Sequence, residues 1–182
     1  FFAAADQMAD TFDVVLANPP YTGDIAQTIR YVEKILGALR PGGRCGILVP
    51  EGLLTNAASL KVVQTRRELL RRHTLTAVVS LPLEMYQPYT RSHSSLLVLK
   101  KGREESVGEV FFSCVPEHRE AGDRLSAQHG ADMVRVWSAW ERYRRGEREQ
   151  EGTFPDYWTA FEEEIGQGDC LFAAEAYRPA RY

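Results

Sequence analysis

The chain has 182 residues, of which 44% are hydrophobic, and its 22 Lys and Arg against 25 Asp and Glu give a formal net charge of -3. No apolar run is long enough for a membrane span and no signal-peptide pattern is present, so we expect neither a membrane protein nor a secreted one. A nucleic-acid binder held only by phosphate contacts would usually be basic, so any DNA-binding surface must be local or supplied by a partner. The three cysteines lack metal-ligand spacing and predict buried thiols of a reduced, cytoplasmic protein without a bound metal: Cys45, Cys114 and Cys170.

The first half of the chain alternates predicted strands and helices. Residues 12–17 (FDVVLA) form an apolar run rich in β-branched side chains, typical of a strand buried on both faces. We then expect a helix at 25–39, a turn at 41–43, and a strand at 44–50. A polar-faced helix at 60–73 and strands at 75–81, 94–99 and 109–115 follow. This order predicts a parallel α/β sheet, with an antiparallel part where no helix separates the last strands.

Beyond residue 116 the composition becomes charged and rich in turn residues. We therefore expect an α/β domain over residues 1–115 and an extension over 116–182 that is mostly helical or irregular. A helix at 132–145 would carry one stripe of large apolar side chains: Met133, Val136, Trp137, Trp140 and Tyr143. The stripe is explained either by packing on the core or by docking of a partner subunit.

The most informative residues follow the first predicted strand: Asn18, Pro19, Pro20 and Tyr21. Ligands of open α/β sheets bind outside the carboxyl ends of the strands, where this motif lies. The two prolines stiffen the backbone, which leaves carbonyl acceptors at Asn18 and Pro19 beside the amide oxygen of the Asn18 side chain. The alternative is that these four residues only form the turn that closes the strand.

Two converging acceptors suit a group with two N–H donors, such as the exocyclic amine of adenine. Holding both hydrogens would favour a pyramidal nitrogen whose lone pair is free to attack a methyl group. The ring of Tyr21 offers a flat face for a base that has swung out of the double helix. The candidate catalytic residues are therefore the four of this motif.

FDVVLANPPY resembles the catalytic block of amino-methyltransferases. The sequence downstream resembles the modification subunit of type I restriction-modification systems in three blocks: ILGALRPGGRCGILVPEGLL, TAVVSLPLEMYQPYTRSHSSLLVLKKG and EEEIGQGDCLFAAEAYRPARY. The resemblance implies the second half of a Rossmann-like methyltransferase sheet with mixed parallel and antiparallel strands. It further implies adenine-N6 methylation of DNA with S-adenosylmethionine as donor, in which Asn18 and Pro19 bind the amine and Tyr21 stacks on the base.

The resemblance also implies partners and a cofactor site. Double-stranded DNA would be the substrate, and a specificity subunit and a nuclease subunit would be the protein partners. The family binds S-adenosylmethionine on a glycine-rich loop and an acidic residue that precede this block. Gly42, Gly43 and Gly46 follow a helix and are interpreted as a turn, so cofactor-binding residues stay unassigned, with Asp6 as a weak candidate.

Two other functions remain open: a non-catalytic module of the same fold that holds DNA or an assembly together, and a protein glutamine N5-methyltransferase. A glycine-rich strand–turn–helix upstream would exclude the first, and the long segment after the sheet disfavours the second.

Several further residues are interpreted as structural or solvated: the arginines 66, 67, 71 and 72 on one solvated helix face, His73 and His93 at the surface or at caps, and Glu51 as a capping or solvated carboxylate. Met85, Tyr86 and Tyr89 either line a DNA-facing cleft or pack within a loop.

Overall fold

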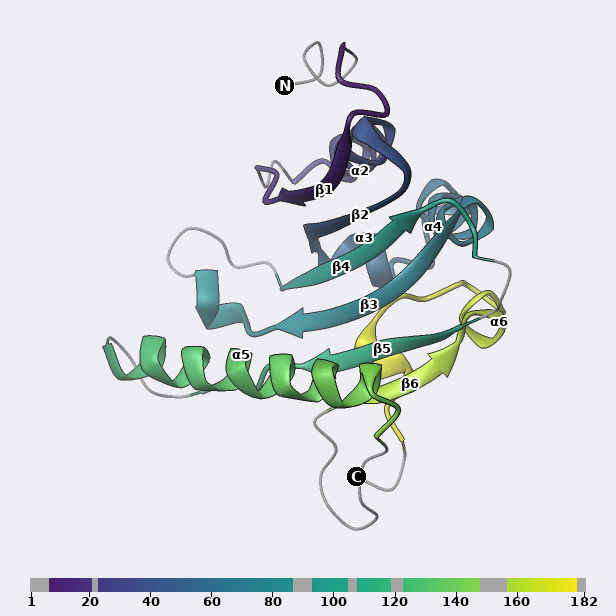
Figure 1. The fold of residues 1–182 in the computed structure, drawn as a ribbon. Helices are drawn as coiled ribbons and strands as arrows, with labels where there is room; N and C mark the ends of the chain where they lie inside the picture. Colours follow the sequence, from purple (N-terminus) through teal and green to yellow (C-terminus); the bar gives the residue numbers. More distant parts are fainter. Residues whose placement is uncertain are drawn as a thin grey trace.

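The structure, a computed structural model, describes residues 7–20, 23–86, 93–104, 108–118, 123–147 and 157–179. Its centre is a six-stranded sheet in the order β1-β2-β4-β3-β5-β6 (Figure 1). The strands are β1 (Phe12–Ala17), β2 (Leu39–Pro50), β3 (His73–Leu81), β4 (Ser94–Lys101), β5 (Glu109–Cys114) and β6 (Trp158–Phe161). β1 pairs parallel with β2 and β3 with β5, whereas β4 is antiparallel to both β2 and β3. The predicted mixed sheet is confirmed, and the carboxyl ends of β1, β2, β3 and β5 lie at one edge.

Helices flank this sheet: α2 (Ile25–Ala38), α3 (Glu51–Thr55), α4 (Leu60–Arg72), α5 (Asp123–Arg144) and α6 (Glu162–Ile165), with short 3-10 turns η1 (Leu83–Tyr86) and η2 (Ala174–Tyr177). α2 begins where the Asp24 carboxylate accepts a hydrogen bond from the backbone N–H of Ala26 at 2.8 Å. Ser59 caps α4 by accepting from the N–H of Val62. None of the helices described is both long enough and apolar enough to cross a bilayer.

The sheet has a separate apolar core on each face. On one face, α2 and α4 bury residues such as Val32, Ile35 and Val62 against the central strands. On the other face, α5 runs along β5 (Figure 1) and packs Ala139 and Trp140 on a cluster that includes Phe111.

β1 is only half covered, so the prediction of a strand buried on both faces is wrong for it. Val15 and Ala17 pack against the core under α2. Their neighbours on the opposite face are exposed: Phe12 38%, Val14 50% and Leu16 81%. The reason is that α5 packs over β3 and β5, leaving the β1 end of that face without a helix among the described residues.

The predicted turn at 41–43 lies inside the pairing of β1 with β2. Phe12 pairs with Leu39 but Val14 pairs with Arg44, so the residues between them on β2 form an irregularity. Gly42 has φ +77°, a conformation that side chains disfavour. A Cβ on Gly43 would lie 2.9 Å from the Arg40 carbonyl oxygen and 3.0 Å from that of Phe12. Gly42 therefore permits the turn of the backbone, and Gly43 permits the close approach of β1.

The C-terminal residues contribute more to the sheet than the sequence indicated. β6, which the sequence analysis did not anticipate, pairs antiparallel with β5. Cys170, Phe172 and Ala174 are buried in the core that also contains α2 and α4. A domain boundary at residue 116 stays a prediction, while strands from both sides of it share one sheet.

Arg66 is completely buried, so its assignment to a solvated helix face is wrong. Its Nε donates to the carbonyl oxygen of Cys170 at 2.6 Å and its Nη1 to that of Leu53 at 2.9 Å. Nη2 donates to the carbonyl oxygens of Asn56 and Asp169. Burial lowers the pKa of this guanidinium. Its hydrogen bonds connect the loop after α3 to the C-terminal segment. The other three arginines of the cluster are exposed, as expected.

Candidate active site

The proline-rich motif lies at the carboxyl edge of the sheet, immediately after β1. β1 and β2 are paired up to Ala17 and Ile47, so Asn18 and Pro20 continue alongside the last residues of β2. Asn18 and Pro20 are exposed and Pro19 is partly buried. Tyr21 and Asp6 lie outside the described residues. The expected position of the motif is found, and the roles of its residues stay predictions.

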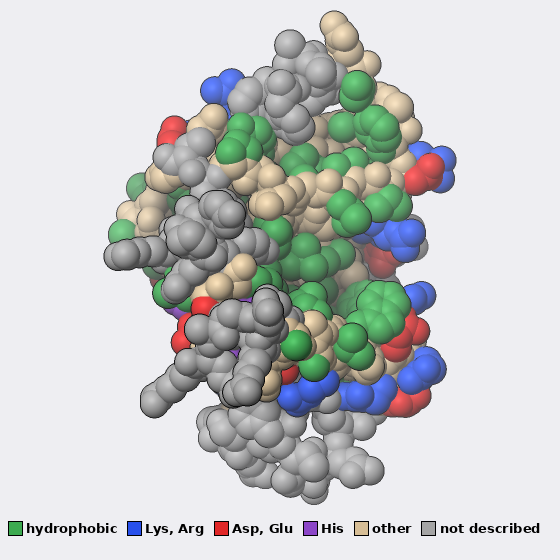
Figure 2. All heavy atoms as spheres, turned by 90° about the vertical axis from the view of Figure 1, so that its left-hand side faces the viewer, with side chains coloured by type: hydrophobic (Ala, Val, Ile, Leu, Met, Phe, Trp, Pro, Cys, Tyr) green, Lys and Arg blue, Asp and Glu red, His purple; other side chains and the backbone are tan. Residues whose placement is uncertain are grey.

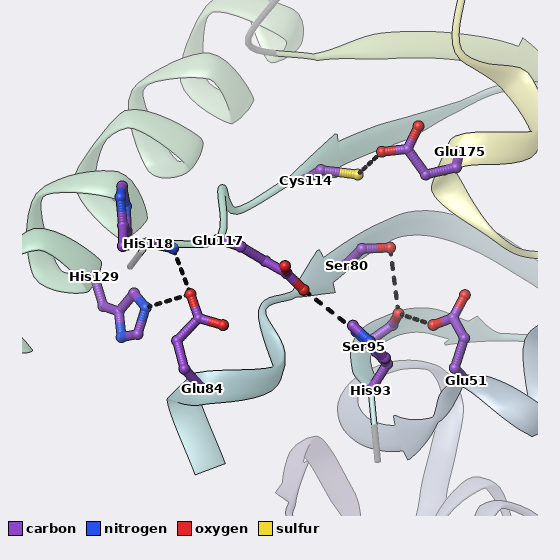
Figure 3. A network of polar contacts seen from close by, with 10 residues as sticks. All are labelled: Glu51, Ser80, Glu84, His93, Ser95, Cys114, Glu117, His118, His129 and Glu175. Atoms are coloured by element: carbon purple, nitrogen blue, oxygen red, sulfur yellow. Dashed lines mark hydrogen bonds and ion pairs between the residues drawn. The ribbon is translucent and has the colours of Figure 1, made fainter. Parts of the chain in front are cut away.

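A cleft of about 460 Å³ opens at the same edge of the sheet, where β2, β3 and β5 end. Its lining includes Glu51, His93 and Glu117, together with the pair Cys114 and Glu175 (Figure 3). The three glutamates lie on the same edge as Asn18, and among the described residues Arg178 is the one Arg or Lys that lines the cleft. The cleft therefore carries acceptor groups, which suits a ligand that presents N–H donors or positive charge.

Glu51 connects β2 to the floor of this cleft. It is the first residue of α3 and is half-buried, and its Oε2 accepts a hydrogen bond from Ser95 Oγ at 2.9 Å. The Ser95 hydroxyl in turn lies 3.5 Å from the hydroxyl of Ser80 on β3. The backbone N–H of Glu51 donates to the carbonyl oxygen of His93 at 2.9 Å. Glu51 is thus held from β3 and β4 rather than freely solvated, as Figure 3 shows.

Cys114, at the other end of the cleft, is not a nucleophile. Burial first, and the neighbouring Glu175 carboxylate second, raise the pKa of its thiol to about 12. The protonated thiol donates to Glu175 Oε1, 3.2 Å from the sulfur. Arg178 contacts the same carboxylate at 3.0 and 3.1 Å. The negative charge of Glu175 is therefore compensated.

A histidine–carboxylate network fixes the rim of the cleft. The backbone N–H of His118 donates to Glu84 Oε1 in η1, and its ring Nε2 lies 2.5 Å from Asp132 Oδ2 on α5. His129 of α5 lies 3.7 Å from the same Glu84 oxygen (Figure 3). Sequence reasoning missed this network because its members are far apart in the chain and follow no motif.

The described residues do not supply a cradle for the implied methyl donor. Gly43 accommodates the approach of β1, and a Cβ on Gly46 would touch the Leu16 and Leu96 side chains. None of Gly42, Gly43 and Gly46 lies in the turn from a strand into a helix that a cofactor loop requires. Over the residues that the structure describes, no group of three His, Cys, Asp or Glu side chains is arranged to bind a metal.

The aromatic stripe on α5 is divided between two environments. Trp140 packs edge-on against Phe111, with ring centroids 5.2 Å apart, and Tyr143 lies on the same cluster. Trp137 is 62% exposed, and Val134 and Met133 beside it are also exposed. Figure 2 shows hydrophobic side chains in a broken band between the β1 end and α5. The core-packing interpretation therefore holds for Trp140, and docking remains a hypothesis for Trp137.

Comparison with known proteins agrees with this arrangement. The sequence profile of the N-6 DNA methylase family matches residues 2–177. A protein from a structure of the type I restriction-modification system is 24% identical, with a TM-score of 0.68 over 92% of this chain and 38% of its own. The type I methyltransferase subunit from Streptococcus thermophilus is 19% identical, with a TM-score of 0.65 over 93% of this chain and 39% of its own.

The M protein of the type I restriction enzyme EcoKI is 15% identical, with a TM-score of 0.66 over 96% of this chain and 43% of its own. At these identities the likeness establishes the fold. The chain spans 38–43% of the length of these three proteins. No curated protein sequence matches it.

Proposed function

Because the chain belongs to the N-6 DNA methylase family, we propose that its protein methylates the N6 amine of adenine in DNA within a restriction-modification system. The observation that carries this proposal is the position of Asn18 and Pro19 at the carboxyl end of β1, on the sheet edge that also holds an acceptor-lined cleft. The similar structures are of proteins from type I restriction-modification systems. This likeness supports the same assignment, and favours DNA over a protein glutamine side chain as the substrate.

In this proposal the motif binds the target amine and orients its lone pair. The Asn18 side-chain oxygen and a backbone carbonyl accept the two N6 hydrogens, and the ring of Tyr21 stacks on the extruded base. The reaction forms a bond between N6 and a methyl carbon, breaks the bond from that carbon to the donor sulfur, which keeps the electron pair, and releases one N6 proton to water. Positioning and electrostatics account for catalysis, since no covalent enzyme intermediate is needed.

S-adenosylmethionine, the donor used by this family, would bind on residues other than those described here. Double-stranded DNA, a specificity subunit and a nuclease subunit are the proposed partners, in the cytoplasm. The near-balanced charge of the chain fits a complex in which a partner subunit makes most contacts to the DNA phosphates.

Replacing Asn18 in the full-length protein tests the proposal. Asn18→Ala removes an acceptor that acts on the reacting amine, so we expect kcat for adenine methylation to fall more than tenfold, or about 1.4 kcal/mol. The affinity for DNA and for the methyl donor should stay nearly unchanged. Gln64→Ala, an exposed change on α4, serves as the control and should keep full activity. More than about a tenth of wild-type turnover in the Asn18 variant would contradict the assigned role.

A second candidate function is that of a non-catalytic module that holds DNA or an assembly together. The lack of a donor cradle among the described residues favours it. Calorimetric titration of S-adenosylmethionine separates the two candidates. We expect no micromolar binding by this chain alone and saturable binding by the full-length protein, whereas a full-length protein that binds no donor would establish the non-catalytic role.

A further inference from the structure

Among the described residues, the Glu51 carboxylate has no positive partner, in contrast to two other carboxylates near the sheet. Glu162, which is 5% exposed, accepts from the backbone N–H of Leu75 and forms an ion pair with Arg103. Glu175 has Arg178 as its partner. Within the described ranges, Glu51 has the neutral hydroxyl of Ser95 and no basic side chain at ion-pair distance. Among the described residues, a neutral donor therefore holds the Glu51 carboxylate.

The position of Glu51 brings that charge beside the motif. β1 and β2 are adjacent and parallel, and neighbouring strands lie about 4.8 Å apart. Continuing their register from Ala17 and Ile47 places Pro20 level with Pro50, one residue before Glu51. Asn18 and Glu51 therefore leave the carboxyl ends of neighbouring strands toward the same side of the sheet. Glu51 also lines the cleft, so its carboxylate is open to a ligand.

The carboxylate is held in a defined direction. Ser95 is fully buried at the start of β4, and its hydroxyl donates to Glu51 Oε2 while Ser80 approaches from β3. With one oxygen fixed, the second faces the cleft. The Glu51 side chain therefore loses less conformational entropy when a ligand binds than a freely rotating side chain would. In Figure 3 the three side chains form one connected row beneath the cleft.

We propose that Glu51 is a further catalytic residue, whose negative charge stabilises the positive charge that develops on the target amine during methyl transfer. This inference rests on the proposed function. As the N6 lone pair forms its bond to the methyl carbon, the nitrogen becomes positive and stays so until its proton leaves to water. A fixed carboxylate in a cleft from which bound DNA excludes water lowers the energy of that transition state more than it would in bulk solvent.

The test uses the full-length protein assembled with its partner subunits. Glu51→Gln keeps an oxygen that can accept from Ser95 but removes the charge. We expect kcat for adenine methylation to fall at least tenfold, with KM for DNA and for the methyl donor within twofold of wild type and Tm unchanged. Glu51→Asp, which retains the charge, should restore a measurable part of kcat. Glu164→Gln, the same change at an exposed carboxylate on α6, away from the cleft, should leave kcat unchanged.

The outcomes separate this inference from the function on which it rests. A wild-type protein that does not methylate adenine overturns the proposed function and the inference with it. An active wild type whose Gln variant keeps kcat within twofold overturns the inference alone. A Gln and an Asp variant that are equally impaired, or that melt at a lower temperature than wild type, would show that Glu51 serves packing and not charge.

Discussion

The two ends of the sheet differ in how completely they are covered. At the β5 end, Phe111 is buried under Trp140 and stacks against Tyr157, while Phe112 packs on Tyr177. At the β1 end, one face is packed and the other exposes Val14 and Leu16. The motif follows the less covered strand. The comparison teaches that the motif follows a strand with one face uncovered among the described residues, whereas the β5 end is packed with aromatic side chains.

The largest effect is expected within the covered region, at Arg66. Arg66→Ala would remove four hydrogen bonds to carbonyl oxygens, two of them buried, so the free energy of unfolding should fall by about 3 kcal/mol or more. Arg66→Lys should recover little, because an ammonium lacks the guanidinium fork. Urea denaturation followed by circular dichroism measures both. Arg67→Ala, an exposed neighbour, is the control and should lose less than about 1 kcal/mol.

The two tryptophans of α5 should differ in the same way. Trp140→Ala removes an aromatic side chain packed on Phe111 and should lower the free energy of unfolding by about 3 kcal/mol. Trp137→Ala should change it by less than about 0.5 kcal/mol, because Trp137 is 62% exposed. The Trp137 variant should instead weaken co-purification with a specificity subunit. Equal co-purification of wild type and this variant would rule out docking through Trp137.

Tyr21 should act through its ring, although it lies outside the described residues. Stacking of an extruded base contributes about 1–3 kcal/mol, so Tyr21→Ala should reduce methylation of duplex DNA substantially, whereas Tyr21→Phe should keep near-normal rates. The loss should shrink on a duplex with a mispaired target adenine, since extrusion is then easier. Methylation rates on matched and mismatched duplexes provide the measurement. A Phe variant as slow as the Ala variant would assign the role to the hydroxyl.

The smallest effect is expected on the exposed face of β1. Leu16 is 81% exposed, so Leu16→Ser in this chain should alter the free energy of unfolding by less than about 0.5 kcal/mol. Leu97→Ser, on the buried part of β4, should lower it by more than 2 kcal/mol. Thermal denaturation of both variants measures the contrast. A loss above 1.5 kcal/mol for Leu16→Ser would mean that this face is covered.

Local patterns predicted most elements of this fold. The apolar runs that became β3, β4 and β5 are rich in Val, Leu and Phe, and the apolar face of α2 follows the helical period. β6 escaped notice because its four residues are too short for a period to show. The placement of β4 between β2 and β3 depends on pairing between distant segments, which no local pattern records.

The candidate site was predictable only where its residues are contiguous. The motif from Asn18 could be found because consecutive prolines follow a strand directly. The link from Glu51 to Ser95 spans 44 residues and joins two strands that meet only in the folded sheet. The role of the motif itself stays a prediction, whereas burial of Arg66 was missed because its acceptors come from two segments more than 100 residues apart, around Leu53 and around Cys170.

Arg66 also constrains the order in which the chain can fold. Its Nε bonds to a carbonyl 104 residues downstream, and the N–H of Phe172 bonds to the carbonyl of Leu54. Until the ribosome has made the segment around residue 170, two of the four hydrogen bonds of the Arg66 guanidinium have no acceptor. The core beneath α4 therefore stays solvated and incomplete until then. Contacts of such long sequence separation slow folding, and a nascent chain in this state is exposed to aggregation and proteolysis until the segment around residue 170 has been made.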